Sequence, residues 1–392
     1  MLVRAFSPCR IGSAFCARPS RADNCYLCGL GVTTVVDMTL HPSMTEPILE
    51  ASRKSGLRMV HCFVRQEEEA CMAKKPKESQ LSILRSLSSK DEHSASVLGD
   101  RLSLGLLVDG ITPNYWKGLK EELWPIIKEL DVEVVTSHYV GGPNHVGSSL
   151  VKNFHAHGLL DRSILFSHAC WITEEEVELL KESGSALACT PEIELAMTHG
   201  NPVGLDCSRK GVRVGLGADC TSVVGGDMFT QMRVALAHQR GKENAELAKD
   251  GKIPLKMRTR VAEIFRMATL GGAEALHKEK ELGSLEEGKK ADLLILDASS
   301  PATLGAQHDP LRATVMSAGV NDIGMVLVNG EIVLDRARKQ GPFTRVDWTG
   351  EEAKKIKKAL AAVLQKYENA GGDATGEVAY AQVRAMLQLQ TE

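Results

Sequence analysis

Several features are missing from this chain of 392 residues, and each absence excludes a class of protein. There is no run of about 18 apolar residues, so no membrane-spanning helix is expected. The formal net charge of −3 gives no electrostatic reason to expect a nucleic acid or a membrane as partner. Gly29-Leu30-Gly31 lacks the third glycine of a dinucleotide-binding loop, and Ser148 and Ser149 have no Gly-x-Ser-x-Gly context. We therefore expect a small-molecule substrate as the partner. The chain could also form a homo-oligomer.

The ten cysteines show no pattern of a disulfide framework or a metal site. Cys25-x-x-Cys28 has no second pair and no downstream histidine pair at zinc-finger spacing, so reduced thiols are expected. Because reduced thiols are expected and the sequence has no clear secretory signal, we predict a cytoplasmic location. Residues 1–22 contain four arginines, several serines and no acidic residue, which makes a mitochondrial presequence the weaker alternative. A non-native or truncated start that replaces a lost first segment is a further reading of the same residues.

Strand-like and helical patterns alternate from Cys25 onward, which indicates repeated βα units around a parallel sheet. The strand-like runs are Val32–Asp37, Arg58–Val64, Leu102–Val108, Val132–His138, Ser163–His168, Ala186–Cys189 and Val212–Asp219. The helical patterns include Met44–Ser55, Tyr115–Leu130, Gly147–His157, Thr173–Ser183 and Asp227–Gln239. Thr173 and Glu176 form a capping-box pattern at the start of one of them. The polar stretch Glu67–Asp100 is expected to be a surface excursion.

Three of the strand-like runs each deliver a metal-capable side chain at the C-terminal end. These side chains are His138, His168 and Asp219. In an eight-stranded α/β barrel such ends converge on one mouth, where that fold keeps its active sites. Two imidazoles and a carboxylate make a ligand set for one divalent metal, zinc or iron. Such a metal would supply hydroxide, Asp219 would move a proton, and His168 would face the developing oxyanion.

The residue pattern changes after Gly283, where a predicted loop leads into the apolar run Leu293–Leu296. Two further runs, Met325–Val328 and Glu331–Leu334, flank Asn329-Gly330, a strong signal for a type I′ hairpin. This predicts part of a small β-sandwich, with Asp292 structural in one of its turns. The expected organisation is an atypical basic segment at 1–24, a barrel at 25–282, a partial sandwich at 283–345 and a helical extension at 346–392, including Glu351–Lys366.

These residues together resemble the amidohydrolase superfamily, in the branch of cytosine and guanine deaminases and s-triazine chlorohydrolases. The resemblance covers about Cys25 to Asp335. It is carried by Gly31-Val-Thr-Thr-Val-Val-Asp37, Ser137-His138, Phe166-Ser-His168, Gly217-Ala-Asp219, Ala268-Thr-Leu-Gly-Gly-Ala-Glu-Ala275 and Gly288-Lys-Lys-Ala-Asp292. It implies a metal-dependent hydrolase acting on non-peptide C–N bonds of a cyclic or N-heteroaromatic small molecule. His138 would end the fifth barrel strand, His168 the sixth and Asp219 the eighth.

Two departures from the family pattern accompany this resemblance. The family implies a first strand ending in His-x-His, and no such pair lies before Gly31. Many deaminases of the branch carry Glu three residues after the fifth-strand histidine, where this chain has Gly141. The fold expected is therefore α/β, a distorted (β/α)8 barrel of TIM type that lacks its first strand. The alternative function is a catalytically impaired remnant, an N-terminally truncated member of the family.

Four other positions complete the expectations for the site. Glu194 and His199 follow the seventh strand-like run, so both are candidates for substrate contact, with an exposed loop as the equal alternative. His41 follows the first run and would be a partial substitute ligand or an exposed loop histidine. His145, His155 and His157 are expected on or near the helix after His138, away from the mouth.

Overall fold

The computed structural model describes residues 2–4, 29–39, 49, 52–53, 55–64, 101–109, 115–130, 132–140, 149–220 and 223–337. Several sequence predictions lie outside these residues: Cys25-x-x-Cys28, His41, Glu67–Asp100, His145 and Glu351–Lys366. Within the described part of the chain, no helix has the length and apolar character to span a membrane.

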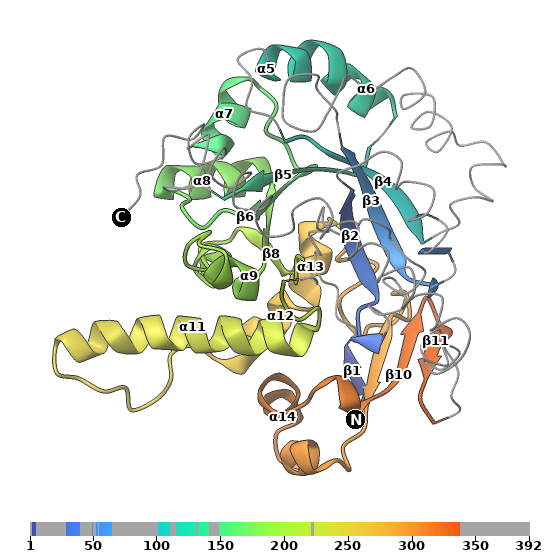
Figure 1. Ribbon diagram of the computed structural model, residues 1–392, viewed down its shortest axis with the longest axis vertical. Coiled ribbons are helices and arrows are strands. Elements are labelled where there is room, and N and C mark those ends of the chain that lie inside the picture. Colours follow the sequence, from blue (N-terminus) through green and yellow to red (C-terminus); the bar gives the residue numbers. More distant parts are fainter. Residues whose placement is uncertain are drawn as a thin grey trace, which may run out of the picture.

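Seven parallel strands form one curved sheet in strict chain order, β2 to β8 (Figure 1). Each of these strands overlaps one of the seven runs predicted from the sequence. Their bounds are β2 Thr34–Thr39, β3 Arg58–Val64, β4 Leu102–Leu107, β5 Val134–Tyr139, β6 Ile164–His168, β7 Ala186–Cys189 and β8 Arg213–Leu216. Sequential parallel strands joined by helices are the βα arrangement that the alternating pattern predicts. A curved sheet of sequential parallel strands with intervening helices agrees with the predicted TIM-type α/β fold at that level.

Helices lie between successive strands of this sheet from β4 onward and after its last strand, β8 (Figure 1). They are α5 Tyr115–Gly118, the π-helical turn Leu119–Leu123, α6 Trp124–Glu129, α7 Leu150–Ala156, α8 Glu174–Ser183, α9 Pro191–Ala196, α10 Gly204–Arg209, α11 Met228–Lys249, α12 Val261–Met267, α13 Leu270–Ala275 and α14 Pro310–Met316. The predicted capping box of α8 is confirmed, with Thr173 as N-cap and Glu176 at the third position. Helix α11 runs ten residues past the predicted end at Gln239, and Gly241 lies inside it without a positive φ, so this glycine does not act as a C-cap.

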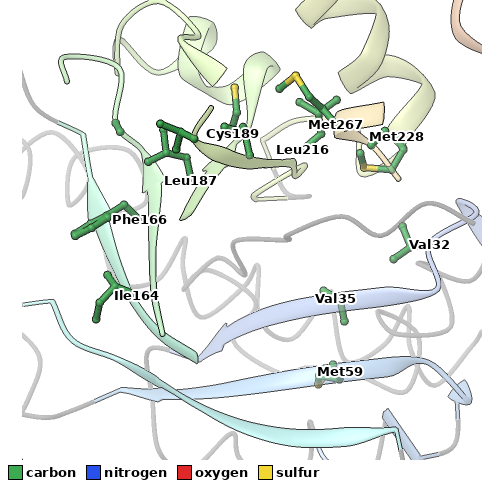
Figure 2. Packing of buried hydrophobic residues seen from close by; sticks show 14 of the residues in the cluster. Val32, Val35, Met59, Ile164, Phe166, Leu187, Cys189, Leu216, Met228 and Met267 are labelled. Carbon is green, nitrogen blue, oxygen red and sulfur yellow. The ribbon is translucent and has the colours of Figure 1, made fainter. Parts of the chain in front are cut away.

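Alternate residues of each strand enter two different apolar clusters. In β3, Val60 and Cys62 join the cluster inside the curve of the sheet, whereas Met59 and Phe63 join the layer against the helices. Figure 2 shows members of the outer cluster on several strands together with Met228 of α11 and Met267 of α12. Both faces of the sheet are therefore buried, as a parallel sheet requires.

A second, antiparallel sheet has the strand order β1-β9-β10-β11. Its strands are β1 Leu2–Arg4, β9 Leu293–Leu296, β10 Ile323–Val328 and β11 Glu331–Asp335, with 3-10 turns at Pro301–Gln307 and Val320–Asp322. The predicted hairpin is confirmed, because Asn329 and Gly330 both have positive φ, 52° and 80°. The sequence did not predict β1, which pairs with β9 and brings residues 2–4 into this sheet. The other predicted domain boundaries stay predictions.

One buried ion pair joins the two sheets. The Arg58 guanidinium, at the start of β3, lies 3.2 Å from Asp292 Oδ1, and both side chains are almost fully buried. The same carboxylate oxygen accepts the backbone N–H of Asn329 in the hairpin at 2.8 Å. Because both charges have partners, burial is tolerated and the hairpin is tied to the sheet. The structural role predicted for Asp292 is confirmed.

The sheet is curled, with β2 and β8 at its two ends. Helix α13 packs against β8 so closely that a Cβ on Gly271 would lie 2.4 Å from the carbonyl oxygen of Val214. Ala275 and Leu276, at the end of α13, join the cluster inside the curve. The described strands thus make an incomplete barrel. The predicted absence of a first strand and the predicted partial β-sandwich are each confirmed only in part.

Candidate functional site

His138 and Asp109 form a pair at the mouth of the curled sheet. Asp109 follows β4 and His138 is the fifth residue of β5, on the inner face with Val134 and Thr136. The Nδ1 atom of His138 lies 2.5 Å from Asp109 Oδ2, and the His138 backbone N–H donates to Oδ1 at 2.8 Å. Ser137 Oγ also donates to Oδ1, at 3.0 Å, which makes three hydrogen bonds to this carboxylate. The carboxylate therefore fixes the ring through Nδ1 and leaves Nε2 for another partner.

His168 ends the neighbouring strand β6 and makes a different set of contacts. Its Nδ1 atom lies 2.9 Å from the hydroxyl oxygen of Thr190 and 3.6 Å from Glu194 Oε1. Its backbone φ is 71°, and the next residue, Ala169, has φ 54°. Two consecutive non-glycine residues in the left-handed region cost free energy, and such conformations gather at functional sites. This turn places the imidazole beside that of His138, with ring centres 6.0 Å apart.

Asp219 comes from the loop after β8 and faces both imidazoles. Its Oδ2 atom lies 3.6 Å from His168 Nε2, and its charge acts on His138 as well. Its backbone φ is 60°, a third non-glycine residue in the left-handed region at this mouth. The ends of β5, β6 and β8 therefore bring together the three side chains that the sequence analysis selected.

His199 adds a third imidazole to the mouth. Its ring packs edge-on to His168, with centres 4.6 Å apart, and the carbonyl oxygen of His199 accepts the indole N–H of Trp171 at 2.7 Å. Gly200 follows with φ 127°, where a Cβ would lie 2.8 Å from Cys170 Cβ and from the Trp171 indole nitrogen. Among the described residues, the buried Nδ1 atom of His199 has no hydrogen-bond partner. A buried, unpaired ring nitrogen beside His168 suits contact with a substrate.

Burial and neighbouring charges shift the pKa values of these groups in different directions. Burial lowers the pKa of His168 to about 4, opposed by the charge of Asp219 and assisted by that of His138. Burial also lowers the pKa of His199 to about 4, assisted by His168. For His138, burial is outweighed by the Asp109 carboxylate, so its pKa is raised. Burial raises the pKa of Glu194 to about 7.

The donor types suit a divalent metal, since imidazole and carboxylate are zinc and iron ligands. In the parts of the chain that the structure describes, however, no three His, Cys, Asp or Glu side chains lie close enough to enclose a metal ion. The described residues thus do not complete a metal site by themselves, and metal binding by His138, His168 and Asp219 stays a prediction.

Glu194, expected to contact substrate, lies at the mouth but is fully buried. Its Oε1 accepts the backbone N–H of Thr190 at 2.7 Å, and its Oε2 accepts the thiol of Cys189 at 3.3 Å. Both oxygens are therefore turned to the protein. Asp37, which the sequence places at the end of a strand, lies 3.4 Å from the buried His61 and not at the cluster.

His155-Ala156-His157 is a His-x-His in sequence, but it does not end a strand. It lies at the end of α7, where His155 is exposed and His157 Nδ1 donates to the carbonyl oxygen of Asn153 at 2.9 Å. The His157 ring stacks on Trp116, 4.8 Å between centres. These two histidines are away from the mouth, as predicted.

The sequence analysis did not select Asp109 and Thr190. Asp109 follows an apolar run just as Asp219 does, so the rule that chose Asp219 could have found it. Thr190 carries no comparable signal, because threonine is common after a strand and its role depends on where the β6 turn places His168.

A sequence model described as the amidohydrolase family matches residues 129–333, slightly more than half of the chain. The matched range begins before β5 and ends in β11, so it includes His138, His168 and Asp219.

Curated relatives with similar sequences are named as deaminases. The 5'-deoxyadenosine deaminase of Methanopyrus kandleri is 32% identical over 192 residues, which are 48% of this chain and 41% of that protein. The guanine deaminase of Rattus norvegicus is 30% identical over 167 residues, 43% of this chain and 34% of that protein. The chain therefore spans less than half the length of these two relatives. The alternative of an impaired remnant is not favoured by these names.

Solved structures with similar folds include an adenosine deaminase and an atrazine chlorohydrolase. A zinc-bound adenosine deaminase of Xanthomonas campestris has TM-score 0.67 and 20% identity, covering 88% of this chain and 73% of that one. Atrazine chlorohydrolase of Arthrobacter aurescens, complexed with zinc and atraton, has TM-score 0.69 and 20% identity, covering 87% and 75%. At this identity the likeness shows the fold alone.

Proposed function

The chain belongs to the amidohydrolase family, and we propose that its barrel mouth hydrolyses a carbon–nitrogen bond other than a peptide bond. The substrate is a cyclic or N-heteroaromatic small molecule. The observation that carries this proposal is that His138, His168 and Asp219 converge from the ends of β5, β6 and β8. His168, Ala169 and Asp219 have left-handed backbone conformations there. The deaminase names of the relatives agree with it.

In this reaction Asp219 and His168 face the reacting atoms. The Asp219 carboxylate accepts a proton from the attacking water and returns it to the leaving nitrogen, so that the products are a hydroxylated ring carbon and an amine. His168 lies 3.6 Å from that carboxylate and is almost fully buried, which keeps bulk water away from the proton transfer.

The mouth offers apolar surface for a flat ring. Trp171, Met197 and Val223 follow β6, β7 and β8, and each side chain is about half exposed. Large exposed apolar side chains on the loops of a polar site suit a ligand with an aromatic face. His199, which is only partly buried and packs edge-on to His168, would supply a directional contact to a ring substituent. Glu194 is fully buried, so we do not give it that role.

A divalent metal, zinc or iron, is part of this proposal. His138 and Asp219 would be ligands, with His168 as a third ligand or as a group facing the ion. Zinc in two related structures supports the choice of metal class. Cytoplasmic location and homo-oligomer formation stay predictions.

The test is release of ammonia from aminated heteroaromatic rings, including guanine, adenosine and 5'-deoxyadenosine, by the full chain supplied with zinc or iron(II). We expect the unaltered chain to release ammonia and the His168→Gln variant to release none. His155→Gln is the matched control, because His155 is an exposed histidine on α7. Turnover that survives His168→Gln, or that His155→Gln reduces equally, would place the reaction elsewhere.

A further inference from the structure

A continuous row of polar atoms leads from the mouth into the protein. His168 Nε2 lies 3.6 Å from Asp219 Oδ2, and His168 Nδ1 lies 2.9 Å from Thr190 Oγ1. Thr190 Oγ1 in turn lies 3.3 Å from Glu194 Oε1. Thr190 and Glu194 are fully buried, and His168 nearly so. Without water to compensate, each hydrogen in this row must have an acceptor.

The donors in the row can be assigned from its inner end. Glu194 Oε1 accepts the backbone N–H of Thr190 at 2.7 Å, and a backbone amide can only donate. This oxygen therefore acts as an acceptor. If the Thr190 hydroxyl gave its one hydrogen to His168, its oxygen lone pairs would face those of Glu194 at 3.3 Å in a buried place. Since an ionised Glu194 has no hydrogen to give, the favourable arrangement for the carboxylate form has the hydroxyl donating to Glu194 and accepting from His168 Nδ1.

The outer end of the row leads to the same assignment. A hydrogen on His168 Nε2 would point toward Asp219 at 3.6 Å, which is beyond hydrogen-bond distance. A hydrogen on Nδ1 has Thr190 at 2.9 Å. A neutral imidazole carries one N–H, so the two nitrogens compete for it and the shorter contact prevails.

We infer that Thr190 and Glu194 are positioning residues that hold His168 in the tautomer with hydrogen on Nδ1, so that Nε2 presents a lone pair toward Asp219. Nε2 then acts as an acceptor, for a proton, a substrate N–H or a cation, and not as a donor to an oxyanion. This assignment replaces the substrate contact expected of Glu194. Only the catalytic use of the Nε2 lone pair rests on the proposed function; the assignment of the tautomer does not.

The position of Glu194 has a structural cause. It lies on the first turn of α9, whose Pro191 gives up no backbone N–H. The carboxylate folds back four residues to the N–H of Thr190, the N-cap, and thereby fixes the hydroxyl of the same residue. The positive φ of His168 then brings the ring to that hydroxyl. Sequence distance conceals this arrangement, because Thr190 and His168 are 22 residues apart.

The test is the tautomer of His168 in the full chain, read from ring nitrogen shifts in long-range proton–nitrogen spectra of ¹⁵N-histidine protein. His168→Gln assigns the signals. We expect a protonated Nδ1 and an Nε2 without hydrogen. In Thr190→Val the ratio should move toward Nε2–H by about fivefold, the effect of one hydrogen bond of ordinary strength. Thr190→Ser, which keeps the hydroxyl, should retain the original ratio.

Two further variants separate positioning from folding. Glu194→Leu frees the Thr190 hydroxyl to donate to Nδ1, so it should also raise Nε2–H. Thr314→Val removes a different buried hydroxyl, which donates to the carbonyl oxygen of Pro310 at 2.8 Å, and should leave the His168 signals unchanged. A hydrogen on Nε2 in the unaltered chain, or no shift in Thr190→Val and Glu194→Leu, would overturn the inference. Since no substrate is used, failure of the proposed hydrolysis would leave this result intact.

Discussion

Two imidazoles at one mouth differ sharply in their surroundings. His138 lies beside the Asp109 carboxylate with its side chain 26% exposed, whereas His168 lies beside the Thr190 hydroxyl with its side chain 1% exposed. Burial acts on both, but the pKa of His138 is raised by Asp109 and that of His168 is lowered to about 4. The ring centres are only 6.0 Å apart.

The difference shows that the acceptor at Nδ1 sets the character of each ring. A carboxylate stabilises a positive charge on the imidazole, while a hydroxyl orients the ring without doing so. The His138–Asp109 region therefore suits charge and ligand binding. The His168–Thr190 region suits a neutral ring with an accepting Nε2 atom. Asp219 faces both regions and connects them.

The largest effect is expected from Asp219→Asn, because this change removes the charge that both imidazoles face. Loss of a proton-transferring group typically lowers turnover by about 10²–10⁴-fold. We expect kcat to fall in that range with unchanged secondary structure, measured by ammonia release and circular dichroism. A loss of less than about tenfold would show that Asp219 does not move the proton.

Asp109→Asn should act mainly on the His138 side of the comparison, because the hydrogen bonds of this carboxylate are made to His138 and Ser137. Removing a carboxylate that orients a ligating histidine typically costs about 10–100-fold in metal affinity. Thr190→Val, on the His168 side, should cost less, because a hydroxyl fixes its ring less strongly. Competition with a chromogenic chelator for zinc measures both. Equal losses in the two variants would contradict the distinction drawn between the two histidines.

Gly105→Ala tests the packing beneath the His138–Asp109 pair. A Cβ there would lie 2.4 Å from Cys62 Sγ and 2.9 Å from the carbonyl oxygen of Val134, so β4 and β5 must separate. Overpacking of this kind costs about 1–3 kcal/mol of unfolding free energy. Gly241→Ala on α11 is the control, since nothing lies within 4 Å of its Cβ position.

The control should be neutral or stabilising by about 0.5–1 kcal/mol, as expected for glycine to alanine in a helix. Urea unfolding measures both variants. If Gly105→Ala were as stable as Gly241→Ala, the strands would not be packed as described.

The smallest effect is expected at the opposite end of β6, where the carboxylate of Asp161 is about as exposed as that of Asp109. Its carboxylate accepts from Lys128 Nζ at 2.8 Å and from the backbone N–H of Ser163 at 2.8 Å. Burial opposes ionisation, but these hydrogen bonds outweigh it and lower the pKa of Asp161. A depressed carboxyl pKa stabilises the fold above the unfolded value near 3.8.

That stability is lost as pH falls through the folded pKa. Asp161→Asn should therefore lower the melting temperature at pH 7, and the difference from the unaltered chain should vanish in acid. Because the pair is partly exposed, we expect less than about 1 kcal/mol at pH 7. A difference that persists or grows as pH falls below 3.8 would show that the charge is not the cause.

Local sequence pattern was sufficient for the strands and for part of the site. Strands β3, β7 and β9 have the predicted bounds, because the apolar runs there are short and sharply limited. His138, His168 and Asp219 were found because each ends such a run. Contacts across the fold were not predictable. The pairing of residues 2–4 with β9 and the bond from His168 to Thr190 depend on tertiary packing and on residues with positive φ, which no local pattern encodes.

The central claim is that the mouth of this barrel holds a working divalent-metal site. The most direct measurement is the metal content of the full 392-residue chain, determined by elemental mass spectrometry after exchange into metal-free buffer. We expect close to one zinc or iron per chain, lost in His138→Ala and in Asp219→Ala but retained in His155→Ala. Absence of metal from the unaltered chain, or its retention in both mouth variants, would contradict the account.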